Sequence, residues 1–323
     1  MIDLVTCGAI NWDINLFVEN LPQKSEEVRV NEIQRVSGGT AANVAVAASR
    51  ILGHRRVAFL GALGSDNIGD KQLNILLRDG VVTSYIIRVN GEESGQAYIT
   101  IDSKGENEVH TYFGANLTLA PEALMDPSIQ KLIDNAKVIV IMDPPLETCQ
   151  RLAEICGGTP TKHVIWDPGV LAQSGLNSIS PVLQYVNYFV LNHVEFENLL
   201  GTKDPCTIGE RLAIFNENMK VIVKQGSRGS VLYSNKEKIS LSMSAIPLDK
   251  LGLELVNTVG CGDAFIGAFA SAKVEGLSDE EALRWGCAAG AYNATKKETR
   301  GSPTFKQLES VLKKWVDLQE QWL

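Results

Sequence analysis

The sequence predicts an α/β fold: a doubly wound, mostly parallel sheet with a small antiparallel sheet attached to it. Short apolar runs rich in Val and Ile alternate with stretches of helical periodicity, as in sheets whose strands are buried on both faces. Two segments depart from this alternation and show the two-residue period of half-buried strands. No long linker, low-complexity stretch or internal repeat interrupts the chain, so we expect a single domain over residues 1–323.

Apolar runs predict the strands of the main sheet. The first follows the N-terminus, which has no basic region before its apolar stretch and is expected to be a strand rather than a signal peptide. The other runs are 57–63, 136–143, 163–169, 186–192 and 220–226. Helical spacing appears between them, at 41–52, 69–80, 146–156 and 195–201, and again in the tail at 304–322. A strand followed by a helix, repeated along the chain, is typical of a parallel sheet covered by helices.

Residues 14–36 and 94–113 interrupt this alternation, and each segment holds two short strands around a turn. In the second, Ala97, Ile99 and Ile101 alternate with more polar neighbours, which is typical of a strand with one buried face. We expect one small antiparallel sheet that projects from the parallel core, built from strands 14–18, 28–36, 94–102 and 106–113. A projecting sheet with an apolar face serves as a lid, as a dimerisation surface, or as both.

The composition excludes several classes of function. Apolar residues make up 45% of the chain and charged residues 21%, which is ordinary for a globular protein. The net charge of −8 argues against a nucleic-acid partner, and no apolar run is long enough to cross a membrane. The six cysteines form no C-x-x-C pair, and the four histidines lack metal-binding spacing. We therefore expect a cytoplasmic protein with reduced thiols and no tightly bound transition metal.

Polar residues follow several of the predicted strands, at the edge where open α/β sheets bind ligands. The segment "GAINWD" ends in Asn11 and Asp13, Asp143 follows the strand at 136–143, and "NHVE" carries Asn192 and Glu195. The glycine-rich stretches "SGGTAAN" and "KQGSRGS" occupy similar positions. Each one alone is explained by helix capping or a turn. Their joint occurrence at successive strand ends predicts a binding site.

The segment "NTVGCGDAFIGAFASA" (257–272) places small residues and an acid at the start of a predicted helix. Gly260 and Gly262 let backbone N–H groups approach an anion, towards which the helix N-terminus also points. Asp263 could accept the proton of an attacking hydroxyl, and the helix dipole should lower its pKa. An N-cap Asp with glycines for close packing explains the same residues, and local sequence leaves both interpretations open.

Together these motifs resemble those of the ribokinase (PfkB) family of carbohydrate and nucleoside kinases, over nearly the whole length. "SGGTAANVA" is similar to the family's first signature, and "NTVGCGDAFIGAF" to the second, usually written D-T-x-G-A-G-D. "NHVE" resembles the N-x-x-E motif, "KQGSRGS" the nucleotide loop, and "YFGAN" (112–116) a further family segment. The resemblance implies a ribokinase-like fold whose projecting strands cover the substrate.

The resemblance also implies roles for individual residues. Asp263 would be the catalytic base, with Gly260, Cys261 and Gly262 as the anion hole. Residues of the sugar site would be Asn11, Asp13, Gly38, Gly39, Asn43 and Asp143. Residues of the nucleotide site would be Asn192, Lys224, Gly226, Ser227, Gly229 and Cys287. Asn192 and Glu195 would organise Mg²⁺, directly or through water, with ATP as the phosphoryl donor.

Two positions depart from the second signature. Its first acid is Asn257 here, and its usual Ala is Cys261. In many members that acid lies near a monovalent-cation site. An Asn keeps a coordinating oxygen but loses the charge, so activation by such a cation is open.

The resemblance implies a carbohydrate kinase that phosphorylates the primary hydroxyl of a ribose-type sugar. A nucleoside offers the same ring and hydroxyl, so a nucleoside kinase is the alternative. A non-catalytic sugar-binding module is disfavoured because Asp263 and both glycines are present, and a vitamin-type kinase because of the paired lid segments. We further expect a homodimer formed through the lid sheets.

Overall fold

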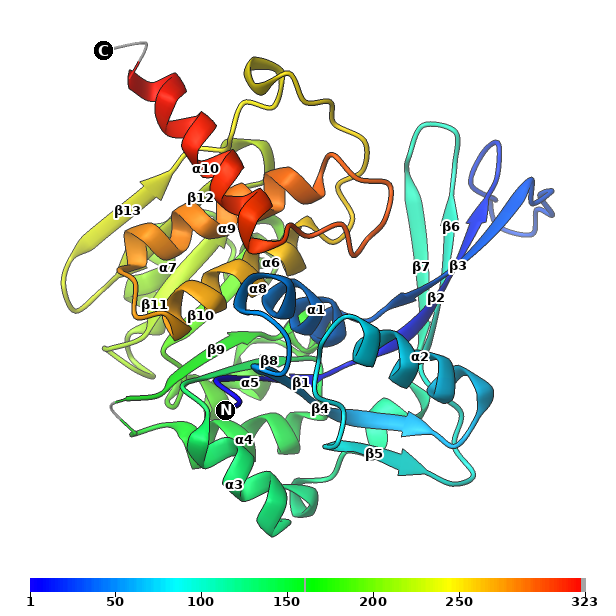
Figure 1. Cartoon of the computed structure of the whole chain (residues 1–323), viewed down its shortest axis with the longest axis horizontal. Helices are drawn as coiled ribbons and strands as arrows, with labels where there is room; N and C mark the ends of the chain where they lie inside the picture. The colour runs from blue at the N-terminus through cyan, green and yellow to red at the C-terminus, as the bar shows by residue number, and fades with distance from the viewer. Residues whose placement is uncertain (160, 321–323) are drawn as a thin grey trace.

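The computed structural model describes residues 1–159 and 161–320, and its centre is a nine-stranded sheet (Figure 1). The strand order is β13-β12-β11-β10-β9-β8-β1-β4-β5, and every pairing is parallel except β11–β12 and β12–β13. The strands are β1 (Leu4–Gly8), β4 (Val57–Gly64), β5 (Ile86–Val89), β8 (Val138–Met142), β9 (His163–Asp167), β10 (Tyr188–Asn192), β11 (Lys220–Lys224), β12 (Ser230–Ser234) and β13 (Ile239–Met243). This confirms the doubly wound, mostly parallel sheet.

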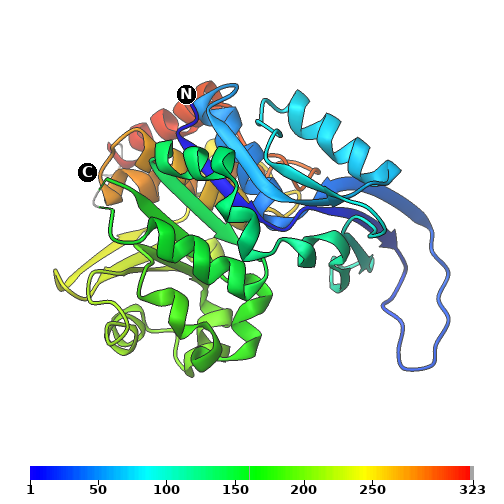
Figure 2. The ribbon, with the colours of Figure 1, turned by 90° about the horizontal axis from the view of Figure 1, so that it is seen from below.

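Helices cover both faces of this sheet, because alternate residues of its strands point into two separate apolar layers (Figures 1 and 2). Leu4 of β1 lies in one layer and Val5 in the other. The first layer is closed by α1 (Thr40–Leu52), α2 (Asn67–Arg78), α8 (Cys261–Val274), α9 (Asp279–Asn293) and α10 (Phe305–Glu320). The second is closed by α3 (Pro127–Asn135), α4 (Leu146–Cys156), α5 (Leu176–Leu183), α6 (His193–Leu200) and α7 (Pro205–Leu212).

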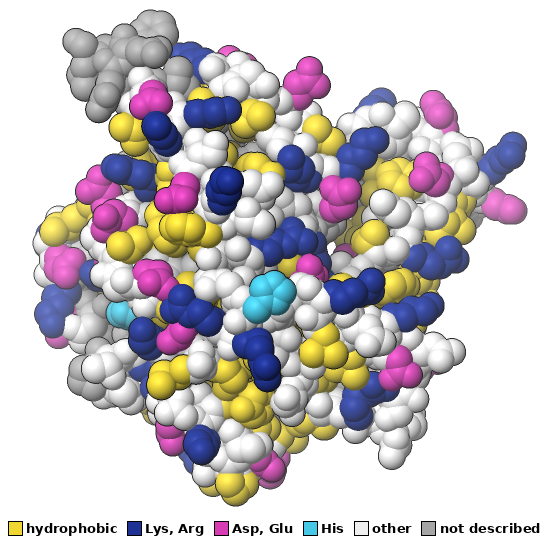
Figure 3. Space-filling view, in the orientation of Figure 1, with side chains coloured by type: hydrophobic (Ala, Val, Ile, Leu, Met, Phe, Trp, Pro, Cys, Tyr) yellow, Lys and Arg dark blue, Asp and Glu magenta, His cyan; other side chains and the backbone are white. Residues whose placement is uncertain are grey.

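A second sheet of four strands, which we call the lid sheet, projects from the core (Figures 1 and 3). Its order is β3 (Glu32–Gly38), β2 (Asn11–Phe17), β6 (Gln96–Ile101) and β7 (Asn107–Tyr112). The prediction of a purely antiparallel sheet is wrong at its centre, where β2 and β6 pair in parallel. The reason is topological: β2 and β6 are the outgoing strands of two antiparallel pairs, β2–β3 and β6–β7, that lie side by side. The connection between β2 and β3 extends beyond the sheet (Figure 2).

The sequence located most of these elements to within a few residues. β3 begins at Glu32 rather than near residue 28, and the predicted tail helix is α10, whose predicted end at 321–322 lies outside the described residues. Elements that it did not propose include β12 and β13, which extend the sheet at one edge, and α9, which packs beside the predicted helix α8. Over the part of the chain that the structure describes, no helix is long and apolar enough to cross a membrane.

Candidate active site

Asp263 lies in the first turn of α8, in contact with the start of α1. Gly260 precedes the helix as its N-cap, in the left-handed conformation with φ 79° and without a side-chain cap. The Asp263 carboxylate therefore does not cap its own helix. Its Oδ2 accepts a hydrogen bond of 2.8 Å from Nδ2 of Asn43. Of the two interpretations that local sequence left open, the capping one does not describe this residue.

Burial raises the pKa of Asp263 to about 6, although the hydrogen bond from Asn43 and the nearby Lys224 lower it. The expectation that the helix dipole would lower this pKa is therefore wrong in its net direction. Desolvation at the bottom of the site outweighs the stabilisation of the carboxylate at the helix N-terminus. A pKa near 6 still leaves most of the side chain ionised at neutral pH, which a general base requires.

The ammonium group of Lys224 lies beside the predicted anion hole. A Cβ at Gly262 would lie 3.5 Å from Nζ of Lys224, in ordinary contact, so the ammonium group lies close to the backbone of this residue. Gly260 is required for another reason, because a Cβ there would come within 2.2 Å of the carbonyl oxygen of Thr299. Cys261, between the two glycines, is half-buried, and burial raises the pKa of its thiol.

Lys224 forms an ion pair of 2.7 Å with the buried carboxylate of Asp167. Asp167 is not among the predicted site residues, although it ends β9 much as Asp143 follows β8. That position after a buried strand is the signal that could have identified it. The ammonium group of Lys224 lies beside the helix N-terminus, where both favour an anion, and Asp167 balances its charge when no anion is bound.

The glycine pair 38–39 brings the chain against the lid strand β2. A Cβ at Gly38 would lie 2.0 Å from Oδ2 of Asp13, and one at Gly39 would lie 2.5 Å from the backbone nitrogen of Asn11. Gly39 also has φ 89°, which favours glycine. The close approach is therefore the reason for both glycines, and it gathers Asn11, Asp13 and the N-terminus of α1 at one place.

Asn11 is oriented by Asn116, a residue of the "YFGAN" segment to which the sequence analysis gave no role. Nδ2 of Asn116 donates to Oδ1 of Asn11 at 2.9 Å, and its Oδ1 accepts from the backbone nitrogen of Ile10. Both asparagines are buried. The contact leaves the Nδ2 group of Asn11 to donate towards a ligand.

Asp143 adopts a left-handed backbone conformation with φ 55°, which is uncommon outside glycine. Its Oδ2 accepts from Thr40 at 3.1 Å and its Oδ1 from the backbone nitrogen of Val170 at 2.9 Å. Burial, followed by the negative charge of Asp167, raises its pKa to about 7. Burial likewise raises the pKa of Asp13 to about 7, with Asp263 adding to the effect. These buried carboxyl groups are strong acceptors for hydroxyl groups.

The residues assigned to nucleotide and metal lie at the ends of β10 and β11. Asn192 and Glu195 form a capping box at the start of α6: Asn192 Oδ1 accepts from the backbone nitrogen of Glu195 at 2.9 Å, and Glu195 Oε2 accepts from that of Asn192 at 2.7 Å. Burial and the negative charge of Asp167 raise the pKa of Glu195. No group of three or more His, Cys, Asp or Glu side chains suited to a metal ion occurs within residues 1–159 and 161–320.

The remaining residues assigned to the nucleotide lie in different surroundings. Gly226 and Ser227 are exposed in a short turn after β11. Gly229 is required by packing, because a Cβ there would lie 2.0 Å from the carbonyl oxygen of Met243. Cys287 of α9 is buried, with its Sγ 3.3 Å from Oγ of Ser230. It lies behind β12 rather than at the surface of the turn.

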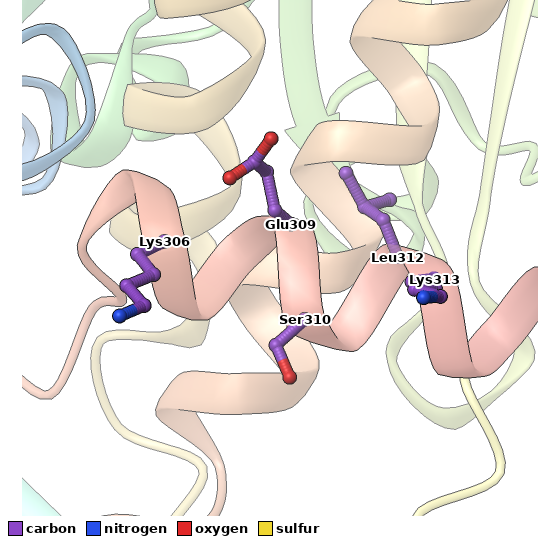
Figure 4. Close-up of a pocket in the computed structure, with 5 residues that line it drawn as sticks. All are labelled: Lys306, Glu309, Ser310, Leu312 and Lys313. Atoms are coloured by element: carbon purple, nitrogen blue, oxygen red, sulfur yellow. The ribbon is translucent and has the colours of Figure 1, made fainter.

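A shallow hollow of about 490 Å³ on the surface is unrelated to these residues. Its five lining residues all come from α10, as Figure 4 shows: Lys306, Glu309, Ser310, Leu312 and Lys313. None of the candidate site residues lines it.

The chain is similar in sequence and in fold to known proteins over nearly its whole length. The family model described as "pfkB family carbohydrate kinase" matches residues 1–305. A ribokinase from Arabidopsis thaliana is 31% identical over 322 residues, which are 96% of this chain and 80% of that protein. A ribokinase from Haemophilus influenzae is 28% identical over 94% of this chain and 96% of that protein. The structure of the Arabidopsis thaliana ribokinase complexed with ribose and ATP matches with a TM-score of 0.82 at 28% identity, over 97% of this chain and 99% of that chain.

Proposed function

This chain belongs to the pfkB family of carbohydrate kinases, and we propose that it transfers the γ-phosphoryl group of ATP to the primary hydroxyl of a ribose-type sugar. Asp263 carries the proposal. Its carboxylate accepts a hydrogen bond from Asn43, which follows the glycine pair 38–39. It also lies in the first turn of α8, near Lys224. One carboxylate thus lies between a place suited to hydroxyl groups and a place suited to an anion.

In the proposed reaction Asp263 takes the proton of the acceptor hydroxyl as that oxygen attacks the γ-phosphorus. The bond between the γ-phosphorus and the bridging oxygen breaks, and ADP leaves. The N–H groups at the start of α8 and the ammonium group of Lys224 stabilise the negative charge on the transferred group. Gly262 lets this charge approach the backbone.

Asn11, Asp13, Asn43 and Asp143 would hold the hydroxyl groups of the sugar. The carboxyl groups of Asp13 and Asp143 each offer acceptors, and Asn11 offers an oriented amide. Ribose is favoured because the relatives at 28–31% identity are named ribokinase, one of them solved with ribose and ATP. Gly38 and Gly39 would let the sugar and the lid strand approach the start of α1.

The residues present fit a magnesium nucleotide. Magnesium usually keeps several waters and relies on phosphates and one or two carboxylates, so a dedicated cage of side chains is not required. Glu195, near Asp167 and Lys224, would hold the ion through water, and the exposed turn at Gly226 and Ser227 would contact the nucleotide. When bound, Mg²⁺ neutralises charge on the phosphates.

A nucleoside is the second candidate acceptor, and one feature of the lid sheet favours it. The pairing register places Phe17, Ile99 and Val109 on the same face as Asp13. An apolar surface beside the sugar site could pack against a base. If the acceptor were a free sugar, this apolar surface would instead pack against the core when the lid closes, and closure would exclude water during transfer.

The opposite face of the lid sheet supports the proposed homodimer. Ile33, Tyr98 and Tyr112 share this face by register, and 47%, 41% and 47% of their surfaces are exposed. Contact with the same face of a second copy would cover them about a two-fold axis. A sheet of this size with exposed apolar side chains gains stability from such a contact.

A panel of acceptors tests the proposal: ribose, other pentoses, fructose and nucleosides, each with ATP and Mg²⁺. We expect the highest kcat/KM with ribose or a close pentose. A kcat/KM that is higher for nucleosides would support the second candidate, and transfer to none of the acceptors would overturn both.

A further inference from the structure

Arg300, in the loop between α9 and α10 (residues 294–304), is bonded to two parts of the candidate site. Its Nε donates to Oδ1 of Asn43 at 2.8 Å, and its Nη2 donates to the carbonyl oxygen of Gly38 at 3.0 Å. Its third nitrogen, Nη1, is buried and has no hydrogen-bond partner among the described residues. Arg300 is not among the residues to which the sequence motifs gave a role.

The hydrogen bond from Arg300 determines the orientation of the Asn43 side-chain amide, that is, which way its oxygen and its NH₂ group point. A guanidinium group can only donate hydrogen bonds, and an ionised carboxylate can only accept them. Asn43 lies between the two, with Oδ1 towards Arg300 and Nδ2 towards Asp263. If the amide rotated by half a turn, its oxygen would face the carboxylate and its NH₂ group would face the cation. The chain Arg300–Asn43–Asp263 therefore has one favourable arrangement.

We propose that Arg300 is a positioning residue: by donating to Asn43 it keeps Oδ2 of Asp263 hydrogen-bonded, so that Oδ1 receives the acceptor hydroxyl. This inference rests on the proposed function, in which Asp263 is the base. Arg300 itself need not touch the sugar or the nucleotide. Because it also binds the carbonyl oxygen of Gly38, the last residue of lid strand β3, it joins the base to the foot of the lid sheet.

The charges around Asp263 agree with this arrangement. Burial lowers the pKa of Arg300 to about 10, which leaves it positively charged at neutral pH. The other charged groups that act on Asp263 or on its neighbours come from several elements: Lys224 of β11, Asp167 of β9, Asp13 of β2 and Asp143 after β8. Lys224 and Arg300 lower the pKa of Asp263, whereas Asp167 raises it.

A double-mutant cycle separates action through Asn43 from a direct effect of charge. Arg300→Met should lower kcat by about tenfold, in line with the loss of one charge-assisted hydrogen bond. It should also move the acid limb of the kcat/KM pH profile to higher pH, because Asp263 loses two influences that lower its pKa. In an Asn43→Ala background the same change should lower kcat by less than about twofold. Arg300→Lys keeps the charge and should fall between wild type and Arg300→Met in kcat, which also serves if the Met variant does not fold.

The matched control is Arg50→Met. Arg50 of α1 donates to the carbonyl oxygens of Arg300 and Ser302, at 2.5 and 3.0 Å, so it anchors the same loop without contacting Asn43. We expect this variant to keep the wild-type pH profile. Equal losses of kcat from Arg300→Met in both backgrounds, or the same shift of the pH profile in Arg50→Met, would overturn the proposal. The Asp263→Asn variant separates this failure from a failure of the proposed function. If that variant kept near-normal turnover, Asp263 would not be the base, and the proposed function would fail as well.

Discussion

Asn43 and Asp263 lie 220 residues apart in the sequence and are joined by a hydrogen bond of 2.8 Å between Nδ2 and Oδ2. The first residue follows the glycine pair at the start of α1, and the second lies in the first turn of α8. The bond therefore connects the proposed sugar side of the site with the proposed anion side. It depends on the packing of α1 against α8, where a Cβ at Gly267 would lie 2.6 Å from Cβ of Ala47.

The buried carboxyl groups should make the fold less stable as the pH rises. The pKa of Asp13 is raised from 3.8 to about 7, so the folded chain holds this proton more tightly than the unfolded chain. The stabilising contribution is complete below about pH 4 and is lost as the pH rises towards 7. Asp13→Asn should therefore raise the unfolding temperature at pH 8 and leave it nearly unchanged at pH 4.

Thermal unfolding at these two values checks the prediction, with the exposed Asp317→Asn as the control. An Asp13→Asn variant that is less stable than wild type at pH 8 would contradict the inference that the buried, ionised Asp13 carboxylate destabilises the fold. The same variant should lose sugar affinity, because stability is exchanged for function at such sites.

Glu195 should act on activity through magnesium. Glu195→Gln keeps a side chain that can complete the capping box, so α6 should form normally. The variant should need a higher Mg²⁺ concentration for half-maximal activity and should lose turnover at limiting Mg²⁺. Titration of activity against Mg²⁺ measures both effects, with Glu197→Gln on the same helix as the control. Unchanged turnover and Mg²⁺ dependence would remove Glu195 from this role.

Asn257 should make activity nearly independent of K⁺. Its Nδ2 donates to the carbonyl oxygen of Lys297 at 3.0 Å, and its Oδ1 accepts from the backbone nitrogen of Val259 at 3.0 Å. The amide thus links the segment before α8 to the loop after α9, and its polar groups are engaged at the position where the family resemblance implies a nearby monovalent-cation site. We expect less than about a twofold change in kcat between K⁺ and a large organic cation, whereas Asn257→Asp loses the donor and should respond to K⁺. Strong activation of the wild-type enzyme by K⁺ would show that the Asn257 amide does not take the place of a bound cation.

The lid sheets should hold two chains together. Replacing both Ile33 and Tyr98 with Glu puts charges on the proposed contact and should convert a dimer into a monomer in light scattering at micromolar concentration. Ile214→Glu, at a position that is 80% exposed elsewhere on the surface, should leave the dimer intact. A wild-type chain that is a monomer and fully active would exclude this contact and leave the kinase assignment untouched.

The sequence predicted the strands of the core because buried parallel strands are continuous apolar runs, as in 138–142 and 220–224. The roles of Asp263 and the glycines of the second signature came from the family resemblance, because local spacing is equally compatible with a capped helix. The sequence did not predict Arg300 or Asp167, whose partners Asn43 and Lys224 are distant in sequence. The parallel pairing of β2 with β6 was also missed, since alternation gives the faces of a strand but not its neighbour. The raised pKa of Asp263 follows from burial, which local spacing does not contain.

Asp263→Asn tests whether Asp263 is the base in phosphoryl transfer from ATP to a sugar hydroxyl. The measurement is kcat for ribose phosphorylation by wild type and variant, with circular dichroism and ribose binding to confirm that fold and site are intact. We expect a loss in kcat of at least about 10²-fold, the range for removal of a positioned base, with ribose affinity largely kept. A folded variant with near-normal turnover would contradict it.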